Sequence, residues 1–259
     1  MVLTVQLQSI EKSRIIHLVK ELKRIIKDKR CLVFIDLEAT QTSHEVIQIG
    51  AYKTYLNDDL LIKKVFKPFE LFVKPKHRVG KYVTELTGIT DLQVKREGVS
   101  YRAALASLKK YCGKDFDKCL FVVYGNTDGS MLRATAENNM DASMQETMFI
   151  VHHIWDFCAF CARYIKGQDG NPMSLTRVLE VFGIPFDGQA HSASADAKNL
   201  MHLYQAFMRS PAILKREYKK TLTHYSGGNN VIREVINRLA NGKDVSARDF
   251  DKIVEDNFR

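Results

Sequence analysis

The sequence lacks the features that would place it in a membrane or mark it for secretion. No stretch of the 259 residues approaches the length of an apolar transmembrane span. The N-terminal segment MVLTVQLQSIEKSR lacks the basic-then-apolar layout of a signal peptide. Internal repeats and low-complexity tracts are also missing, which argues against solenoid and fibrous architectures. We therefore expect an intracellular, cytoplasmic protein.

The cysteines are too few for a disulfide framework, and the residues around them are too apolar. The five cysteines are odd in number, and most of them lie in apolar segments, which is typical of reduced core residues. Cys158 and Cys161 form a CxxC pair in WDFCAFCARY, without a second Cys or His pair at zinc-binding spacing. We interpret this pair as core packing on a helix.

Acidic residues are outnumbered by basic ones. The chain has 30 Asp and Glu against 39 Lys and Arg, a net charge of +9. Such an excess favours a polyanionic partner, either nucleic acid or an anionic surface. The 45% hydrophobic and 27% charged fractions are those of an ordinary globular protein, and the length suffices for one large domain with appendages or for two small ones.

The order of apolar patterns predicts an α/β fold. Strands come first and then alternate with helices, which indicates a mixed central β-sheet flanked by helices. Residues 1–30 form an expected basic amphipathic helix before a core at 31–210, and 211–259 form a helical extension whose last helix opens with a capping pair, Ser246 and Asp249. The expected core strands are 32–38, 45–56, 64–75, 119–125 and 148–154, and the expected core helices are 101–112, 128–138, 156–166, 174–182 and 193–209.

Two acids stand where the first buried strand should end, in FIDLEAT (34–40). Strand residues two apart point to the same face, so Asp36 and Glu38 would place both carboxylates on one side. Their repulsion requires a basic partner, a shared proton or a metal ion. The alternative is that the strand ends earlier and both acids are solvated loop residues.

Three further polar residues lie at element boundaries. Asp128 occurs where the strand ending at Tyr124-Gly125 passes into a helix, and His191 precedes Asp196 in FDGQAHSASADAKN. Taken singly, Asp128 and Asp196 are unremarkable, because acids commonly cap helices or complement their dipoles. A lone histidine is also more often structural than catalytic.

Taken together, these residues resemble the DEDDh group of DnaQ-like 3′-to-5′ exonucleases, which have a ribonuclease H-like fold. The blocks FIDLEAT, EVIQIGAYK, LFVKP, TELTGIT, YGNTD and FDGQAHSASADAKN follow the order found in the Eri-type and KapD-like branch of that group. The resemblance covers roughly residues 31–209. It implies a phosphodiester hydrolase that shortens nucleic acid from the 3′ end to nucleoside 5′-monophosphates.

The resemblance also implies roles for individual residues. Asp36, Glu38, Asp128 and Asp196 would be ligands of two divalent ions, Mg²⁺ or Mn²⁺, because hard cations prefer oxygen ligands. His191 would be the general base, since histidine titrates near neutral pH. The 3′-terminal nucleotide would be bound by segments that contain Thr40, Leu86 and Thr87.

The substrate is less well defined by sequence. The stretch LIKKVFKPFELFVKPKHRVGK (61–81) interleaves basic and aromatic residues, a pattern that suits single-stranded nucleic acid. The alternative is a hairpin with Phe in the core and Lys in solvent. The family branch favours RNA, although DNA remains open, and we expect single-stranded 3′ ends as partners and no membrane. The competing functions are a ribonuclease H-like endonuclease, a catalytically silent nucleic-acid-binding module, and a membrane-surface protein.

Overall fold

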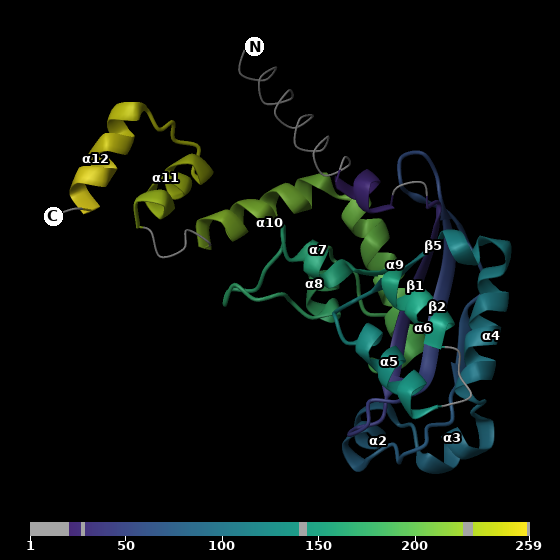
Figure 1. The fold of residues 1–259 in the computed structure, drawn as a ribbon. Helices are drawn as coiled ribbons and strands as arrows, with labels where there is room; N and C mark the ends of the chain where they lie inside the picture. The colour runs from purple at the N-terminus through teal and green to yellow at the C-terminus, as the bar shows by residue number, and fades with distance from the viewer. Residues whose placement is uncertain (1–20, 27–28, 140–143, 225–229, 258–259) are drawn as a thin grey trace.

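The computed structural model describes residues 21–26, 29–139, 144–224 and 230–257 (Figure 1). Most of the helix expected over residues 1–30 lies outside this part of the chain. Its described segment, residues 21–26, is helical, and Leu22 and Ile26 are fully buried in the core. Within the described residues, no helix has both the length and the apolarity needed to cross a bilayer.

Six strands of the described chain form one mixed sheet, in the order β3-β2-β1-β5-β6, with β4 also paired to β2. The central strand β1 pairs antiparallel with β2 and parallel with β5. This arrangement confirms the predicted α/β class. The strands are β1 (Cys31–Ala39), β2 (Val46–Leu56), β3 (Ile62–Val65), β4 (Phe69–Phe72), β5 (Cys119–Val123) and β6 (Ile154–Asp156).

Helices cover both faces of the sheet (Figure 1). Alternate residues of β1 enter two cores: Leu32 and Phe34 pack with α9, and Val33 and Ile35 pack with α4 and α5. The helices of the core domain are α2 (Lys81–Thr87), α3 (Asp91–Glu97), α4 (Tyr101–Cys112), α5 (Asp128–Asn138), α6 (Met144–His152), α7 (Phe157–Cys161), α8 (Leu175–Val181) and α9 (Ala193–Arg209). Asp36 continues the Leu32–Phe34 series, so its side chain is on the α9 face.

Several elements differ from the expectation. The strand predicted over 148–154 is wrong, because residues 144–152 form α6 and only Ile154–Asp156 are extended. The apolar run there also fits a helix face, with Thr147 and Ile150 buried three residues apart. The segment 64–75 divides into β3 and β4, and Pro68, which has no amide hydrogen for a ladder, lies between them.

The short helices α2 and α3 were not predicted. Gly88 ends α2 in a left-handed conformation (φ 77°), and the Thr90 hydroxyl accepts a hydrogen bond from Gln93 N at the start of α3. These two turns place α2 and α3 beyond the sheet, near the carboxyl end of β1 (Figure 1).

Beyond the core, α10 (Pro211–His224), α11 (Asn230–Ala240) and α12 (Ala247–Asn257) form a helical extension. The predicted capping pair is confirmed: Ser246 Oγ accepts from Asp249 N, and the Asp249 carboxylate accepts from Ser246 N. Figure 1 shows α11 and α12 away from the sheet. All five cysteines are free thiols, and Cys161 is buried in the core as expected.

Candidate active site

The first two acids lie on the face of β1 that α9 covers. In the antiparallel register, Asp36 is paired with Gly50 and Glu38 with Gln48. A β-bulge follows directly, between Glu38 and Ala39, so the regular ladder ends beside the acids. Both acids are partly buried. The interpretation of these acids as residues of a strand is therefore confirmed, and the solvated-loop alternative is wrong.

Helix α9 brings the third acid to this face. Gly50 permits the approach, because a side chain there would collide with the backbone of Ala193 and Ser194. Gln48 Oε1 accepts a hydrogen bond from Ala193 N (3.2 Å) and fixes the start of the helix. As a result, carboxylate oxygens of Asp36, Glu38 and Asp196 all lie within 4.8 Å of one another.

Asp128 reaches the same region from the neighbouring parallel strand. It is the first residue of α5, which follows β5, and it is only 6% exposed. Its carboxylate accepts a hydrogen bond from the backbone N–H of Leu37, the residue between the two acids of β1. Asp128 also acts electrostatically on both Asp36 and Glu38. The four acids therefore share one electrostatic environment.

His191 lies on the loop that leads into α9, and its side chain is exposed. Its backbone is in the left-handed region (φ 63°), which is uncommon for a residue other than glycine. In this conformation the backbone N–H groups of His191 and Ser192 donate to the Asp196 carboxylate. The loop thus connects the predicted base to one of the acids.

Burial raises the pKa values of all four acids of the cluster, and repulsion by neighbouring carboxylates adds to the rise for Asp36, Glu38 and Asp128. Burial, followed by repulsion from Asp128, Asp196 and Glu38, raises the pKa of Asp36 well above its ordinary value. Burial and the charges of Asp196 and Asp128 raise the pKa of Glu38 to about 8. Burial raises the pKa of Asp128 to about 7, with repulsion from Asp156 adding to it.

Asp196 follows the same pattern. Burial raises its pKa, and the backbone N–H groups of His191 and Ser192 and the charge of His191 oppose the rise only in part. Clustered oxygen donors with raised pKa values suit hard divalent cations, whose charge would favour the ionised forms. The side chains present therefore fit Mg²⁺ or Mn²⁺.

Of the three residues expected to bind the terminal nucleotide, Thr40 lies in the connection after β1, and Leu86 and Thr87 end α2. Thr40 is buried, and its hydroxyl accepts from Glu45 N (2.9 Å). The Thr87 hydroxyl donates to Val83 O and accepts from Ile89 N. Leu86 is 38% exposed on α2. Contact of these residues with a nucleotide stays a prediction.

Three residues that organise the site were not identified from sequence. Gln48 and Gly50 position α9, and Asp156 accepts hydrogen bonds from Gly125 N and Ala159 N, which holds the turn before Asp128 and caps α7. Two signals were available. A glycine inside an apolar strand indicates close backbone approach, and Asp156 directly follows the apolar pair Ile154-Trp155, much as Asp36 follows the apolar run of β1.

Comparison with known proteins agrees with this arrangement. The family model RNase_T, described as Exonuclease, matches residues 33–204. The chain belongs to this exonuclease family. Among curated proteins, none matches the sequence significantly.

Solved structures share the fold. The chain resembles the 3′-exonuclease solved in a study of 3′-end specific recognition of the histone mRNA stem-loop (TM-score 0.58, 17% identity, 70% of this chain and 83% of that chain). It also resembles the nuclease domain of 3′hExo, a DEDDh family member, bound to rAMP (TM-score 0.54, 20% identity, 71% and 94%). A third similar structure is E. coli Exonuclease I with a dT13 oligonucleotide (TM-score 0.54, 18% identity, 74% and 45%).

Proposed function

We propose that this exonuclease is a divalent-metal-dependent enzyme that removes nucleotides from the 3′ end of single-stranded nucleic acid, with RNA favoured and DNA possible, and releases nucleoside 5′-monophosphates. The observation that carries the proposal is the convergence of Asp36, Glu38 and Asp196 within 4.8 Å, at the end of a strand, with Asp128 beside them. A single-stranded 3′ end fits the net charge of +9. It also fits the similar solved structures, one from a study of the recognition of an mRNA stem-loop by a 3′-exonuclease and one of Exonuclease I with a dT13 oligonucleotide.

The four carboxylates would hold two divalent ions, directly or through water. When bound, such ions supply Lewis-acid stabilisation of the phosphoryl and leaving oxygens. The carboxylates of β1 come from one rigid strand, and Asp196 is fixed to that strand through Gln48 and Gly50. Such positioning is the main contribution that a protein makes to phosphodiester hydrolysis of this kind.

His191 would take a proton from the attacking water. Its exposed side chain is accessible from solvent, and its backbone N–H is bonded to Asp196, so the imidazole is held near the acids without being buried among them. The same loop geometry would let His191 pass the proton to bulk solvent after each cycle.

The experiment is a time course on single-stranded RNA and DNA oligonucleotides of one sequence, labelled at the 5′ end, with Mg²⁺, Mn²⁺ or EDTA, beside an Asp36→Ala control. We expect a metal-dependent ladder that shortens from the 3′ end, with RNA degraded faster, and no ladder with the variant. Internal fragments at early times would instead indicate an endonuclease. Binding without cleavage in any metal would indicate a catalytically silent module.

A further inference from the structure

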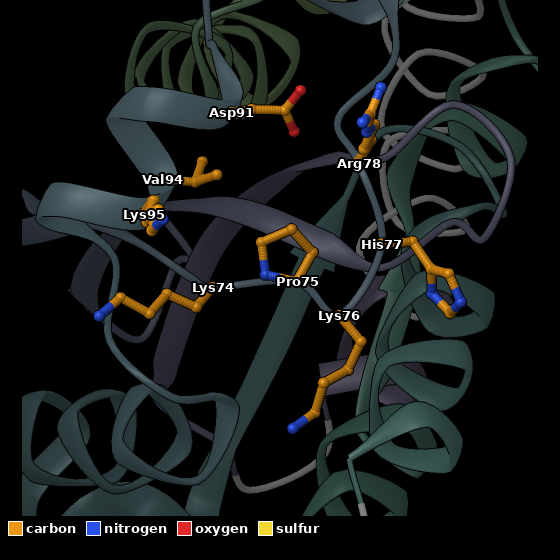
Figure 2. A pocket seen from close by; sticks show the side chains of 8 residues that line it. All are labelled: Lys74, Pro75, Lys76, His77, Arg78, Asp91, Val94 and Lys95. Carbon is orange, nitrogen blue, oxygen red and sulfur yellow. The ribbon is translucent and has the colours of Figure 1, made fainter.

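A concave site lies outside the acidic cluster, between residues 74–78 and helix α3 (Figure 2). It has a volume of about 450 Å³, and its lining includes the four cations Lys74, Lys76, Arg78 and Lys95. All four side chains are exposed. We refer to this site as the basic pocket.

The cations of the basic pocket have no acidic partner in the described part of the chain. Within the described residues, no ion pair joins any of the four to a carboxylate. Asp91 is the one acid in the lining, and its Oδ1 accepts a hydrogen bond from Val79 N (2.8 Å). Four cations around a hollow with a single, already engaged carboxylate favour an anionic ligand.

The backbone of the basic pocket is held in place by a buried carboxylate. Glu45 is fully buried and accepts hydrogen bonds from the backbone N–H groups of Lys76 (2.9 Å) and His77 (3.1 Å). His77 Nδ1 lies 2.6 Å from the same carboxylate, and in Figure 2 this ring points away from the lysines. Lys74, Lys76 and Arg78 therefore project from a loop with a fixed backbone, and Lys95 projects from α3, which lowers the entropic cost of binding a ligand.

The same network links the basic pocket to the acidic cluster. Glu45 lies in the connection that follows Glu38, where Thr40 N donates to Glu45 O and Gln41 N donates to Val79 O. The basic loop is thus bonded to the residues directly after the first pair of acids. A polymer whose 3′ end lies at the acids has two possible paths away from them. One runs past this end of the sheet, where the basic pocket lies, and the other runs past another side of the cluster.

The fold separates the basic residues of the stretch 61–81, which alternate with aromatic residues in the sequence, into two groups. Lys64 on β3 is paired with Tyr55, which is paired in turn with Cys31 at the start of β1, so Lys63 and Lys64 lie at the opposite end of the sheet from Glu38. Lys74, Lys76 and Arg78 lie at the acid end. Only the second group can contact a strand close to its reacting 3′ end.

The chemistry of the lining selects the phosphate over the base. Apart from the charged residues and His77, Pro75 and Val94 complete the lining that the described residues form, and none of these lining residues is Phe, Tyr or Trp. Stacking on bases needs such rings, whereas Lys and Arg contact phosphate without regard to sequence.

We propose that the basic pocket binds backbone phosphates of the substrate strand, upstream of the 3′ end held at the acidic cluster. This inference rests on the proposed function and extends that function by naming where the substrate strand lies on the protein. It implies sequence-independent binding and a preference for substrates long enough to reach from the acids to the pocket.

The test compares the triple variant Lys74→Gln/Lys76→Gln/Lys95→Gln with a control, Lys110→Gln/Lys114→Gln/Lys118→Gln. The control removes the same charge from exposed lysines around the start of β5, whose first residue is paired with Cys31 at the far end of β1. Binding of a labelled 20-nucleotide single strand is measured by fluorescence anisotropy in EDTA over a range of salt. Turnover is measured with that strand and with the p-nitrophenyl ester of thymidine 5′-monophosphate, which is too short to reach the pocket.

For the pocket variant we expect weaker binding by on the order of tenfold, and a slope of log K against log salt that is smaller by about 2, since each lost single-strand phosphate contact removes about 0.7. Hydrolysis of the mononucleotide ester should match wild type. An unchanged salt dependence of oligonucleotide binding, as expected if free phosphate were the ligand, would overturn the proposal. An equal loss of oligonucleotide affinity in the control variant would overturn it as well. Wild-type protein that hydrolyses neither substrate would overturn the exonuclease instead, and the anisotropy result would still report on the pocket.

Discussion

The side-chain oxygen of Gln48 accepts a hydrogen bond from the backbone amide of Ala193, and Gln48 is the residue of β2 paired with Glu38. The amide group of Gln48 in turn donates to Glu70 (2.8 Å), so the side chain is held at both ends. The start of α9 is thereby fixed opposite the first pair of acids. The distance between Asp196 and Glu38 is set by this contact and by the missing side chain at Gly50.

Gly50→Ala should inactivate the enzyme without touching a metal ligand. A methyl group there would collide with the backbone of Ala193 and Ser194, so α9 has to move and Asp196 with it. We expect a loss of about 1–3 kcal/mol in the free energy of unfolding, typical of overpacking, and a large fall in kcat. Calorimetry and single-strand turnover measure the two effects.

Gly129→Ala is the matched control for this change. A Cβ at Gly129 would meet Ile154 and Val151 at ordinary contact distances, 3.6 and 3.7 Å. Since alanine is favoured over glycine in a helix by roughly 0.5–1 kcal/mol, this variant should be as stable as wild type or more so. Equal activity of the Gly50 and Gly129 variants would contradict the positioning role of Gly50.

Local patterns predicted the elements that carry the acids. The apolar run before Asp36 indicated β1, and the bounds expected for α4, α5 and α9 are those observed. Alternation along a strand was enough to place Asp36 and Glu38 on one face. These patterns left Asp128 and Asp196 unremarkable when taken singly, and it was the resemblance to the DEDDh exonucleases that grouped the four acids into one expected site.

Contacts between distant segments could not be predicted. Gln48 positions α9 only because that helix covers β2. Glu45 holds the backbone of a loop that lies more than one element away in the chain. The division of the basic stretch into two ends of the sheet depends on strand register. The prediction of a strand at 148–154 was wrong because an apolar run of that length fits either a strand or a helix.

Asp36→Asn should weaken metal binding while leaving the fold intact. The change replaces one carboxylate oxygen of Asp36 with an NH₂ group and removes the negative charge from one of the three acids within 4.8 Å, but it keeps the shape of the side chain. We expect the Mn²⁺ dissociation constant to rise by at least about 100-fold, more than for loss of a typical outer-shell partner. Titration calorimetry measures it, and Asp117→Asn, an exposed acid before β5, is the control. Equal affinity of the two variants would exclude Asp36 as a ligand.

His191→Asn should separate proton transfer from binding. Asparagine tolerates the left-handed backbone found at this position, so the N–H bond to Asp196 is retained and only the imidazole is lost. We expect kcat to fall by about 10²–10⁴-fold, the usual contribution of a general base, with Mn²⁺ affinity and oligonucleotide binding in EDTA unchanged. A variant that loses oligonucleotide binding but keeps its turnover would contradict the assignment.

The metal-free protein should lose stability as pH rises through neutrality. Folding raises the pKa of Glu38 from 4.5 to about 8 and that of Asp128 from 3.8 to about 7. Between pH 4 and pH 8 the folded state therefore binds more protons than the unfolded state, and the free energy of unfolding falls with pH. We expect a decrease of at least about 2 kcal/mol over this range in EDTA.

Divalent ions should reverse this loss where the acids are ionised. At pH 8, Mg²⁺ at about 100 times its dissociation constant would stabilise the folded state by about 2.7 kcal/mol, whereas at pH 5 protons compete for the same oxygens and the effect shrinks. Thermal unfolding with Mg²⁺ or EDTA across this pH range measures both effects. Glu38→Gln removes one of the repelling charges, so in EDTA its stability should depend less on pH than that of wild type. If the stability of the Glu38→Gln variant in EDTA depended on pH as steeply as that of wild type, Glu38 would not carry the raised pKa on which this prediction depends.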